Sequence, residues 1–146
     1  MRTISRILVT LVIALASVTL ISCSDRIIPS EKLPAAAQSF LKEYFPDSPI
    51  SYVKKEADLT PTYEVVLQNG TEIEFNKKGE WDNIDCKRLA VPAALIPAAI
   101  SEYVNANFPG QSIVKIDRET YGHEIEMANG LELKFDKKGK LLHIDD

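Results

Sequence analysis

A pair of glutamates is the feature of this chain closest to an active site. Glu64 and Glu74 lie in two segments that alternate apolar and polar residues and that a short Asn-Gly turn connects. Such segments pair as antiparallel strands, which would place the two carboxylates opposite each other, about 5 Å apart at Cβ. Their repulsion could raise one pKa for acid–base chemistry, or the pair could bind a hard cation. An open strand pair lacks the enclosed pocket that catalysis favours, so we expect no catalytic residue and keep a small-ligand or divalent-cation-binding module as the alternative.

The histidines and cysteines supply neither an evident nucleophile nor a metal site. His123 and His143 are the only histidines, and no third ligand stands at a spacing typical of zinc sites. His123 falls among the apolar positions of its segment, which favours a packing role. Cys86 has no histidine near it in the sequence to act as its base, so we expect a passive thiol. We predict no metal ion and no cofactor.

Two pairs of lysines stand in turns. Lys77-Lys78-Gly79 follows Asn76, and Lys137-Lys138-Gly139 follows Asp136, a composition typical of tight turns rather than of a nucleic-acid-binding patch. The chain carries a formal net charge of −4 at pH 7. An acidic surface argues against nucleic acid and anionic lipid headgroups as partners.

The same motifs occur twice in the same order, which indicates an internal duplication. The matching pairs are Leu33-Pro34-Ala35-Ala36 with Ile96-Pro97-Ala98-Ala99, Phe45-Pro46 with Phe108-Pro109, Asn69-Gly70 with Asn129-Gly130, Phe75-Asn76-Lys77-Lys78-Gly79 with Phe135-Asp136-Lys137-Lys138-Gly139, and Ile84-Asp85 with Ile144-Asp145. One copy alone is marginal for a stable core, whereas the two together suit one compact domain. We place the copies at residues 33–88 and 89–146.

Each copy predicts one helix followed by four strands. Pro34 and Pro97 fit a first helical turn, apolar residues then recur at helical spacing, and Pro46 and Pro109 end the helices. Short connections make consecutive strands antiparallel neighbours. We expect the strands at residues 50–56, 63–67, 71–76, 81–87, 113–119, 123–127, 131–136 and 141–145. The predicted fold class is α+β, with two tandem α-β-β-β-β repeats forming an antiparallel sheet that carries its helices on one face.

The Asn-Gly hairpin of each copy has a register that follows from its apolar residues. A three-residue loop, 68–70, pairs Val65 with Ile73 and Tyr63 with Phe75 on one apolar face, and the second copy repeats this arrangement. The opposite face is open and acidic, as antiparallel sheets allow. It is the candidate partner-binding surface, formed by Glu64, Val66, Glu72, Glu74, Glu124, Glu126, Glu132 and Lys134.

The last strand of each copy contains an irregularity. Trp81 and Ile84 are three residues apart, as are Leu141 and Ile144, so a regular strand cannot place both members of a pair on one face. A β-bulge would reconcile them. Whether Trp81 belongs to the core or to the surface stays open on these grounds.

The N-terminus has the pattern of an export signal. Residues 1–22 place two arginines before an apolar run and end on a small residue, which predicts a signal peptide. Leu20-Ile21-Ser22-Cys23 resembles the lipobox of bacterial lipoproteins and marks Cys23 as the lipid attachment site, followed by a tether over residues 23–32. If Cys23 carried no lipid, a bridge to Cys86 would be conceivable. We expect an exported protein, lipid-anchored in the bacterial cell envelope and contacting the membrane only through that lipid.

The repeated order of Pro-Ala-Ala, Phe-Pro, Asn-Gly, Glu-x-x-Phe, Lys-Lys-Gly and Ile-Asp resembles the PepSY-like proteins, which are also described as β-lactamase-inhibitor-like. The resemblance covers residues 33–146. It implies an antiparallel sheet with helices, export as a lipoprotein and a non-catalytic role. Related PepSY domains restrain proteases, and true β-lactamase inhibitors grip their enzyme with a concave sheet, although those inhibitors carry disulfides that this chain lacks. Our leading hypothesis is binding, and inhibition, of a protease or other hydrolase through the open acidic face.

Overall fold

The computed structural model describes residues 25–56 and 60–146. The predicted signal peptide and the predicted lipid attachment site, Cys23, lie outside these residues. No helix within the described part of the chain is long and apolar enough to cross a membrane.

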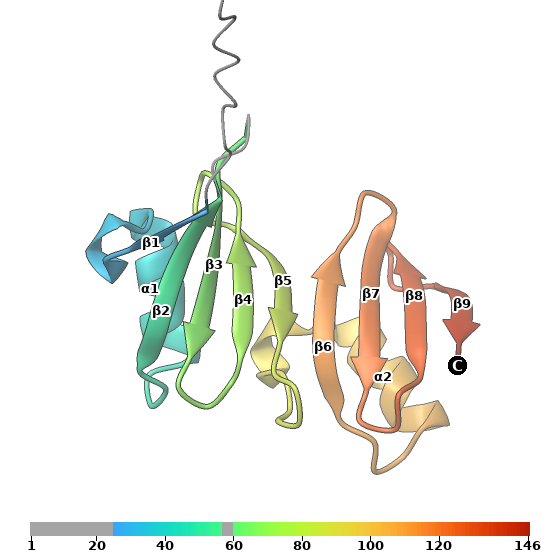
Figure 1. Cartoon of the computed structure of the whole chain (residues 1–146). Coiled ribbons are helices and arrows are strands. Elements are labelled where there is room, and N and C mark those ends of the chain that lie inside the picture. Colours follow the sequence, from blue (N-terminus) through green and yellow to red (C-terminus); the bar gives the residue numbers. More distant parts are fainter. Residues whose placement is uncertain (1–24, 57–59) are drawn as a thin grey trace, which may run out of the picture.

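The centre of the molecule is one antiparallel sheet in which neighbours in the sequence are neighbours in space (Figure 1). Its nine strands are β1 (Arg26–Ile28), β2 (Ile50–Glu56), β3 (Thr62–Leu67), β4 (Glu72–Phe75), β5 (Trp81–Asp85), β6 (Ile113–Arg118), β7 (Gly122–Met127), β8 (Glu132–Asp136) and β9 (Leu141–Asp145). Eight of them match the predicted strands, with ends that differ by at most two residues. The predicted α+β class with an antiparallel sheet is confirmed.

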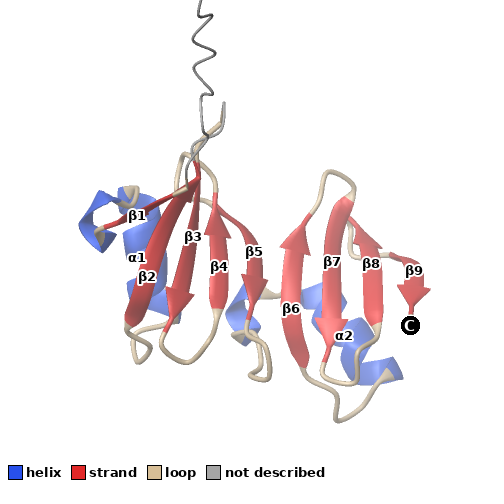
Figure 2. Cartoon of the chain, viewed as in Figure 1, coloured by secondary structure: helices blue, strands red, loops and turns tan. Residues whose placement is uncertain are grey.

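The helices that the structure describes are the short 3-10 helix η1 (Ser30–Lys32), α1 (Ala35–Tyr44), the 3-10 helix η2 (Ala93–Leu95) and α2 (Ala98–Asn107). In the view of Figure 2, α1 and α2 lie behind strands of this sheet, and the short helix next to β1 lies beside its left edge. Pro34 and Pro97 stand one position earlier than predicted, as the residues that precede each helix, with φ at −52° in both. The carbonyl of Pro34 accepts the first helical hydrogen bond, from the amide of Gln38, so the missing amide of proline costs nothing there.

The predicted register of the two Asn-Gly hairpins is confirmed. The amide of Leu67 donates to the carbonyl of Thr71 at 2.8 Å, and that of Met127 donates to the carbonyl of Leu131 at 2.9 Å. Gly70 has a φ of +89°, a left-handed conformation that glycine adopts without steric cost. Each loop therefore has the three residues that keep apolar side chains together on one face.

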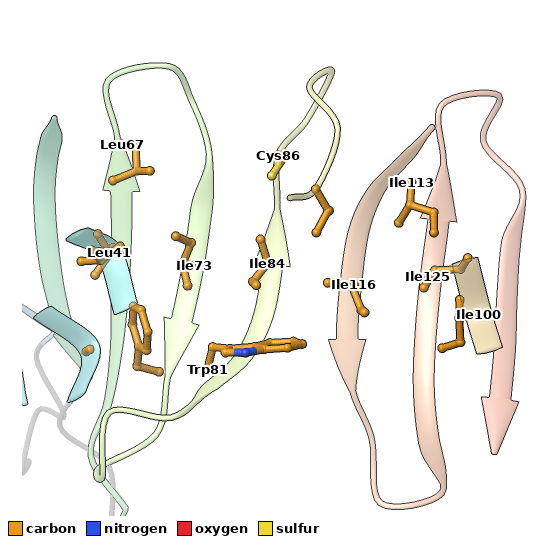
Figure 3. Packing of buried hydrophobic residues seen from close by; sticks show 14 of the residues in the cluster. Leu41, Leu67, Ile73, Trp81, Ile84, Cys86, Ile100, Ile113, Ile116 and Ile125 are labelled. Carbon is orange, nitrogen blue, oxygen red and sulfur yellow. The ribbon is translucent and has the colours of Figure 1, made fainter. Parts of the chain in front are cut away.

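The core lies between the sheet and the helices. Aliphatic side chains from every strand between β2 and β8 form one buried row across the sheet, Val53, Val65, Ile73, Ile84, Ile116, Ile125 and Leu133, part of which Figure 3 shows. Phe40 of α1 contacts Phe75 edge to face, and Tyr103 of α2 contacts Phe135 in the same way. Each helix thus packs on the sheet through one aromatic pair, α1 on β4 and α2 on β8, which adds to the apolar burial.

The expected β-bulge places Trp81 in the core. Phe75 pairs with Trp81 while Glu74 pairs with Asn83, so Asp82 is the extra residue and both Trp81 and Ile84 face the helices. The indole is 6% exposed, and the guanidinium carbon of Arg118 lies 3.7 Å from its ring centroid. Figure 3 shows the ring extending from β5 toward β6. The question that the sequence left open is settled in favour of the core.

Part of the segment that the sequence assigns to a tether, residues 23–32, forms a strand in the structure. Residues 26–28 form β1, which pairs with β2 through Ile28 with Val53 and Ile27 with Lys54. The side-chain amide of Gln38 donates to the carbonyl of Leu33 at 2.9 Å and fastens the following segment to α1. A strand edge carries unpaired backbone groups that any extended neighbour can satisfy, and three residues are too few to show a periodic pattern.

Candidate functional site

The open side of the sheet presents two continuous rows of cross-strand partners. The first row reads Lys54, Glu64, Glu74, Asn83, Asp117, Glu124, Lys134 and His143. The second row reads Tyr52, Val66, Glu72, Asp85, Lys115, Glu126, Glu132 and Asp145. We call these two rows the open face. Every residue that the sequence proposed for the partner-binding surface belongs to one of them.

The junction of β5 and β6 makes this one face instead of two. Asn83 pairs with Asp117 and Asp85 pairs with Lys115, and the side-chain amide of Asn83 donates to the carboxylate of Asp117. The predicted surface did not include these four residues, because the sequence did not predict which strand of one copy pairs with which strand of the other. Their alternation around Ile84 and Ile116, both of which are fully buried, was the signal that could have found them.

Glu74 lies near the centre of the first row, where neighbouring negative charges repel its carboxylate. It stands opposite Glu64, as predicted. Partial burial raises the pKa of Glu74, and the negative charges of Glu56, Glu64 and Asp117 raise it further, while Lys115 acts in the opposite direction. The charged form of Glu74 is therefore disfavoured by its surroundings, one strand away from the junction of β5 and β6.

Lysines compensate the carboxylates toward the ends of the first row. The ammonium of Lys54 lies 3.1 Å from a carboxylate oxygen of Asp25, 3.3 Å from Glu56 and 3.8 Å from Glu64. Hydrogen bonds to Asp25 and Glu56 raise the pKa of Lys54 above its usual value. In the other half, Lys134 lies 3.8 Å from Glu124. In the middle of the face, Lys115 lies 3.2 Å from a carboxylate oxygen of Asp117, so Glu74 is the carboxylate of this row whose pKa its negative neighbours raise.

The second row adds an apolar contact surface and a lysine that bridges two of its carboxylates. Tyr52 is 40% exposed and pairs with the half-buried Val66, so an aromatic ring borders the carboxylates. The ammonium of Lys87 lies 2.8 Å from Glu72 and 2.7 Å from Asp85. Glu126 stands opposite Glu132 without a lysine between them. Tyr52 is the aromatic side chain of this face, because Trp81 points to the other side.

The described residues contain no group of three or more His, Cys, Asp and Glu side chains arranged to hold a metal ion. His123 pairs with Phe135 on the covered side, where desolvation and Arg118 lower its pKa. The Cys86 thiol is buried, and burial raises its pKa, which leaves it protonated and a weak nucleophile. The two lysine pairs occupy hairpin tips, where the carboxylate of Asp136 accepts from the amides of Lys138 and Lys140.

A single antiparallel sheet with two helices and an open, mainly acidic face defines this protein as a compact α+β domain. The family model described as "Putative beta-lactamase-inhibitor-like, PepSY-like" matches residues 61–143. The chain belongs to this PepSY-like family, as its motifs predicted.

Several solved structures share the fold over most of the chain. A "putative periplasmic protein of unknown function" from Bacteroides vulgatus is 44% identical, has a TM-score of 0.81, and aligns over 84% of this chain and 100% of its own. A second periplasmic protein from that organism is 39% identical, also with a TM-score of 0.81, over 86% of this chain and 99% of its own. A "putative calcium-regulated periplasmic protein" from Bacteroides thetaiotaomicron is 44% identical and has a TM-score of 0.81. It aligns over 84% of this chain and 97% of its own. No curated protein matches the chain.

Proposed function

We propose that this protein is a non-catalytic component of the cell envelope that binds another protein through the open face. In this proposal, residues 33–88 and 89–146 are two repeats whose helices cover one side of a shared sheet and leave the other side free. The observation that carries it is the joining of the two acidic halves at β5 and β6, which produces one face that runs across eight strands, from β2 to β9. Its size exceeds what either repeat offers alone.

The charge pattern indicates the chemistry of the partner. Carboxylates are the commonest charged groups of the open face, so a partner surface that places lysine or arginine next to Glu74 would lower the repulsion that raises the Glu74 pKa. Tyr52 adds an exposed aromatic ring of the kind that anchors protein interfaces. A protease or other hydrolase whose substrate cleft is rimmed with basic residues fits this description, and binding there would be inhibitory.

The proposed location in the cell rests on the solved relatives and on the N-terminal sequence. The solved relatives are described as periplasmic, and the sequence pattern predicts export with lipid attachment at Cys23. We propose that the lipid holds the domain at an envelope membrane. The family's β-lactamase-inhibitor-like description supports the inhibitory mode of binding.

A capture experiment from envelope extract tests the proposal. The bait is the mature protein, compared with a variant in which Glu64, Glu74, Glu124 and Glu126 are changed to lysine. A matched control changes Glu31, Glu43, Glu80 and Glu102, which lie on helices and a turn, so that both variants carry the same net charge. We expect partners that are retained by the wild type and by the control and lost by the open-face variant. Identical partners for all three would remove the open face as the binding surface.

A second function, divalent-cation binding by the carboxylates of the open face, has one observation in its favour. The charges of Glu64 and Asp117 raise the pKa of Glu74, and Ca²⁺ binds carboxylate oxygens, although the described residues contain no group of three such side chains arranged to hold a metal ion. The Bacteroides thetaiotaomicron relative is described as calcium-regulated. Titration calorimetry with Ca²⁺ and a thermal melt with and without the ion test this function. The absence of both heat and a change in Tm would rule it out.

A further inference from the structure

The two ends of the sheet differ in how their last strands are used, and β9 is the strand of interest. It pairs with β8 in the same register as β5 pairs with β4: Ile144 opposes Leu133 as Ile84 opposes Ile73, and Asp145 opposes Glu132 as Asp85 opposes Glu72. Both strands have five residues and a bulge at the same place. β5 has a further strand, β6, on its other side, whereas β9 is the last strand of the sheet among the described residues (Figure 1).

The exposed fractions of equivalent side chains in β5 and β9 show which residue a strand added next to β9 would cover. Ile84 is fully buried, and its partner across the β5–β6 junction is Ile116. Ile144, at the matching position of β9, is 41% exposed, and Leu142 beside it is 53% exposed. An exposed strand edge with apolar side chains is a template for another strand.

We propose that the edge of β9 is a second interaction surface, to which a partner protein adds one extended strand. Added strands gain their affinity from backbone hydrogen bonds and their specificity from alternate side chains. Strand addition on β9 would bury Ile144 as β6 buries Ile84. It would also extend the open face by one strand, because the residues on either side of the central apolar one would join its two rows.

The chain itself supplies the template for the partner's sequence. In β6 the residues that meet β5 are Lys115, Ile116 and Asp117, with Lys115 opposite Asp85 and Asp117 opposite Asn83. β9 presents Asp145 where β5 presents Asp85, and His143 where β5 presents Asn83. The complementary strand therefore carries a basic residue, an apolar residue and an acidic or hydrogen-bonding residue in succession, in the antiparallel direction.

The short length and the bulge of β9 do not argue against this use. Both features blunt edge strands in many proteins, but β5 has the same length and a bulge in the same register. It nevertheless forms three residue pairs with β6. The local geometry of β9 is thus compatible with a further antiparallel neighbour.

A synthetic peptide with the sequence of residues 111–118, which contains β6, is the probe. It is titrated into isotope-labelled mature protein while backbone amide signals are followed by NMR. We expect saturable shifts confined to β9 and the adjoining part of β8. A peptide with proline in place of Ile116 is the control, because it cannot form a regular strand, and it should cause no shifts.

Two protein variants locate the binding site. Ile144→Lys should weaken the binding of the peptide by about tenfold or more, since an inward-pointing charge blocks strand addition. Ile27→Lys adds a lysine to β1, the strand at the opposite edge of the described sheet, where Ile27 pairs with Lys54 on the side of the open face, and this variant should bind the peptide as the wild type does. Unchanged signals from β6 and β7 confirm that the variants are folded.

Three results would overturn the proposal. The first is an absence of shifts at saturating peptide, and the second is a set of shifts on β1 that Ile27→Lys abolishes. The third is a change in β9 signals with protein concentration alone, which would assign the edge to a second copy of this chain. None of these outcomes depends on the open face, so the proposal can fail while the proposed function holds.

Discussion

Gly139 packs directly against Ala99 at the start of α2. A Cβ atom on Gly139 would lie 2.5 Å from the Cβ of Ala99, and one on Gly79 would lie 2.9 Å from the Cβ of Pro34 at the start of α1. The Lys-Lys-Gly turn therefore rests on the Pro-Ala-Ala segment in both halves of the molecule. The contact gives a structural reason why the two motifs recur together.

This contact predicts that Gly139→Ala destabilises the protein by about 2–4 kcal/mol, from overpacking added to a left-handed backbone. Gly130→Ala is the matched control, because Gly130 has a φ of +88° and a Cβ added to it would meet no other atom within 4 Å. Gly130→Ala should reduce the free energy of unfolding by only about 1 kcal/mol. Urea unfolding followed by circular dichroism measures both values. Equal losses would show that the helix contact contributes nothing.

The matching isoleucines of β5 and β9 should respond differently to the same small deletion. Ile84→Val removes a methyl group from a fully buried site and should reduce the free energy of unfolding by about 1 kcal/mol. Ile144→Val removes it from the exposed edge and should change the value by less than about 0.5 kcal/mol. Chemical unfolding of the two variants checks this. A loss at Ile144 as large as that at Ile84 would mean that β9 is covered in solution.

The raised pKa of Glu74 predicts a pH-dependent cost to stability. A carboxyl whose pKa is higher in the folded protein than the usual 4.5 favours its protonated form there, so folding becomes less favourable as the pH rises through that range. Glu74→Gln should therefore stabilise the protein near neutral pH by a few tenths of a kcal/mol, since the side chain is largely exposed. The gain should vanish near pH 3, where both states are protonated.

Thermal melts across this pH range measure the effect of Glu74→Gln. Glu102→Gln on the exposed side of α2 is the control for a lost negative charge. A gain for Glu74→Gln that persists at low pH would contradict the electrostatic explanation.

Arg118 should protect the indole that it covers. Its guanidinium lies over Trp81 and also donates to the Trp81 carbonyl at 3.2 Å. Arg118→Ala removes the cation–π contact and the packing of the side chain, which we expect to cost about 1–2 kcal/mol. Trp81 is the one tryptophan of the chain, so a red shift of the emission maximum reports its exposure to water. Lys55→Ala, next to Tyr63, is the control and should leave the emission unchanged.

Much of the local structure could be predicted from the sequence. The alternation of Val65, Ile73 and their neighbours located the strands and set the hairpin register, because a shift by one residue would have turned the apolar side chains toward water. The same alternation assigned Glu64 and Glu74 to the open side. Trp81 could not be placed, because a bulge breaks the period of two on which such assignments depend.

The sequence by itself thus determined eight of the strands, their order within each copy and, away from the bulges, the face on which the side chains lie, since these depend on the spacing of neighbouring residues. Only the tertiary structure decided that β5 meets β6 through Asn83 and Asp117, that residues 26–28 add a strand, and that Ile144 lies at a free edge while Ile84 is buried. Pairing between strand edges is made by backbone groups that every residue possesses. It therefore leaves little trace in the pattern of side chains.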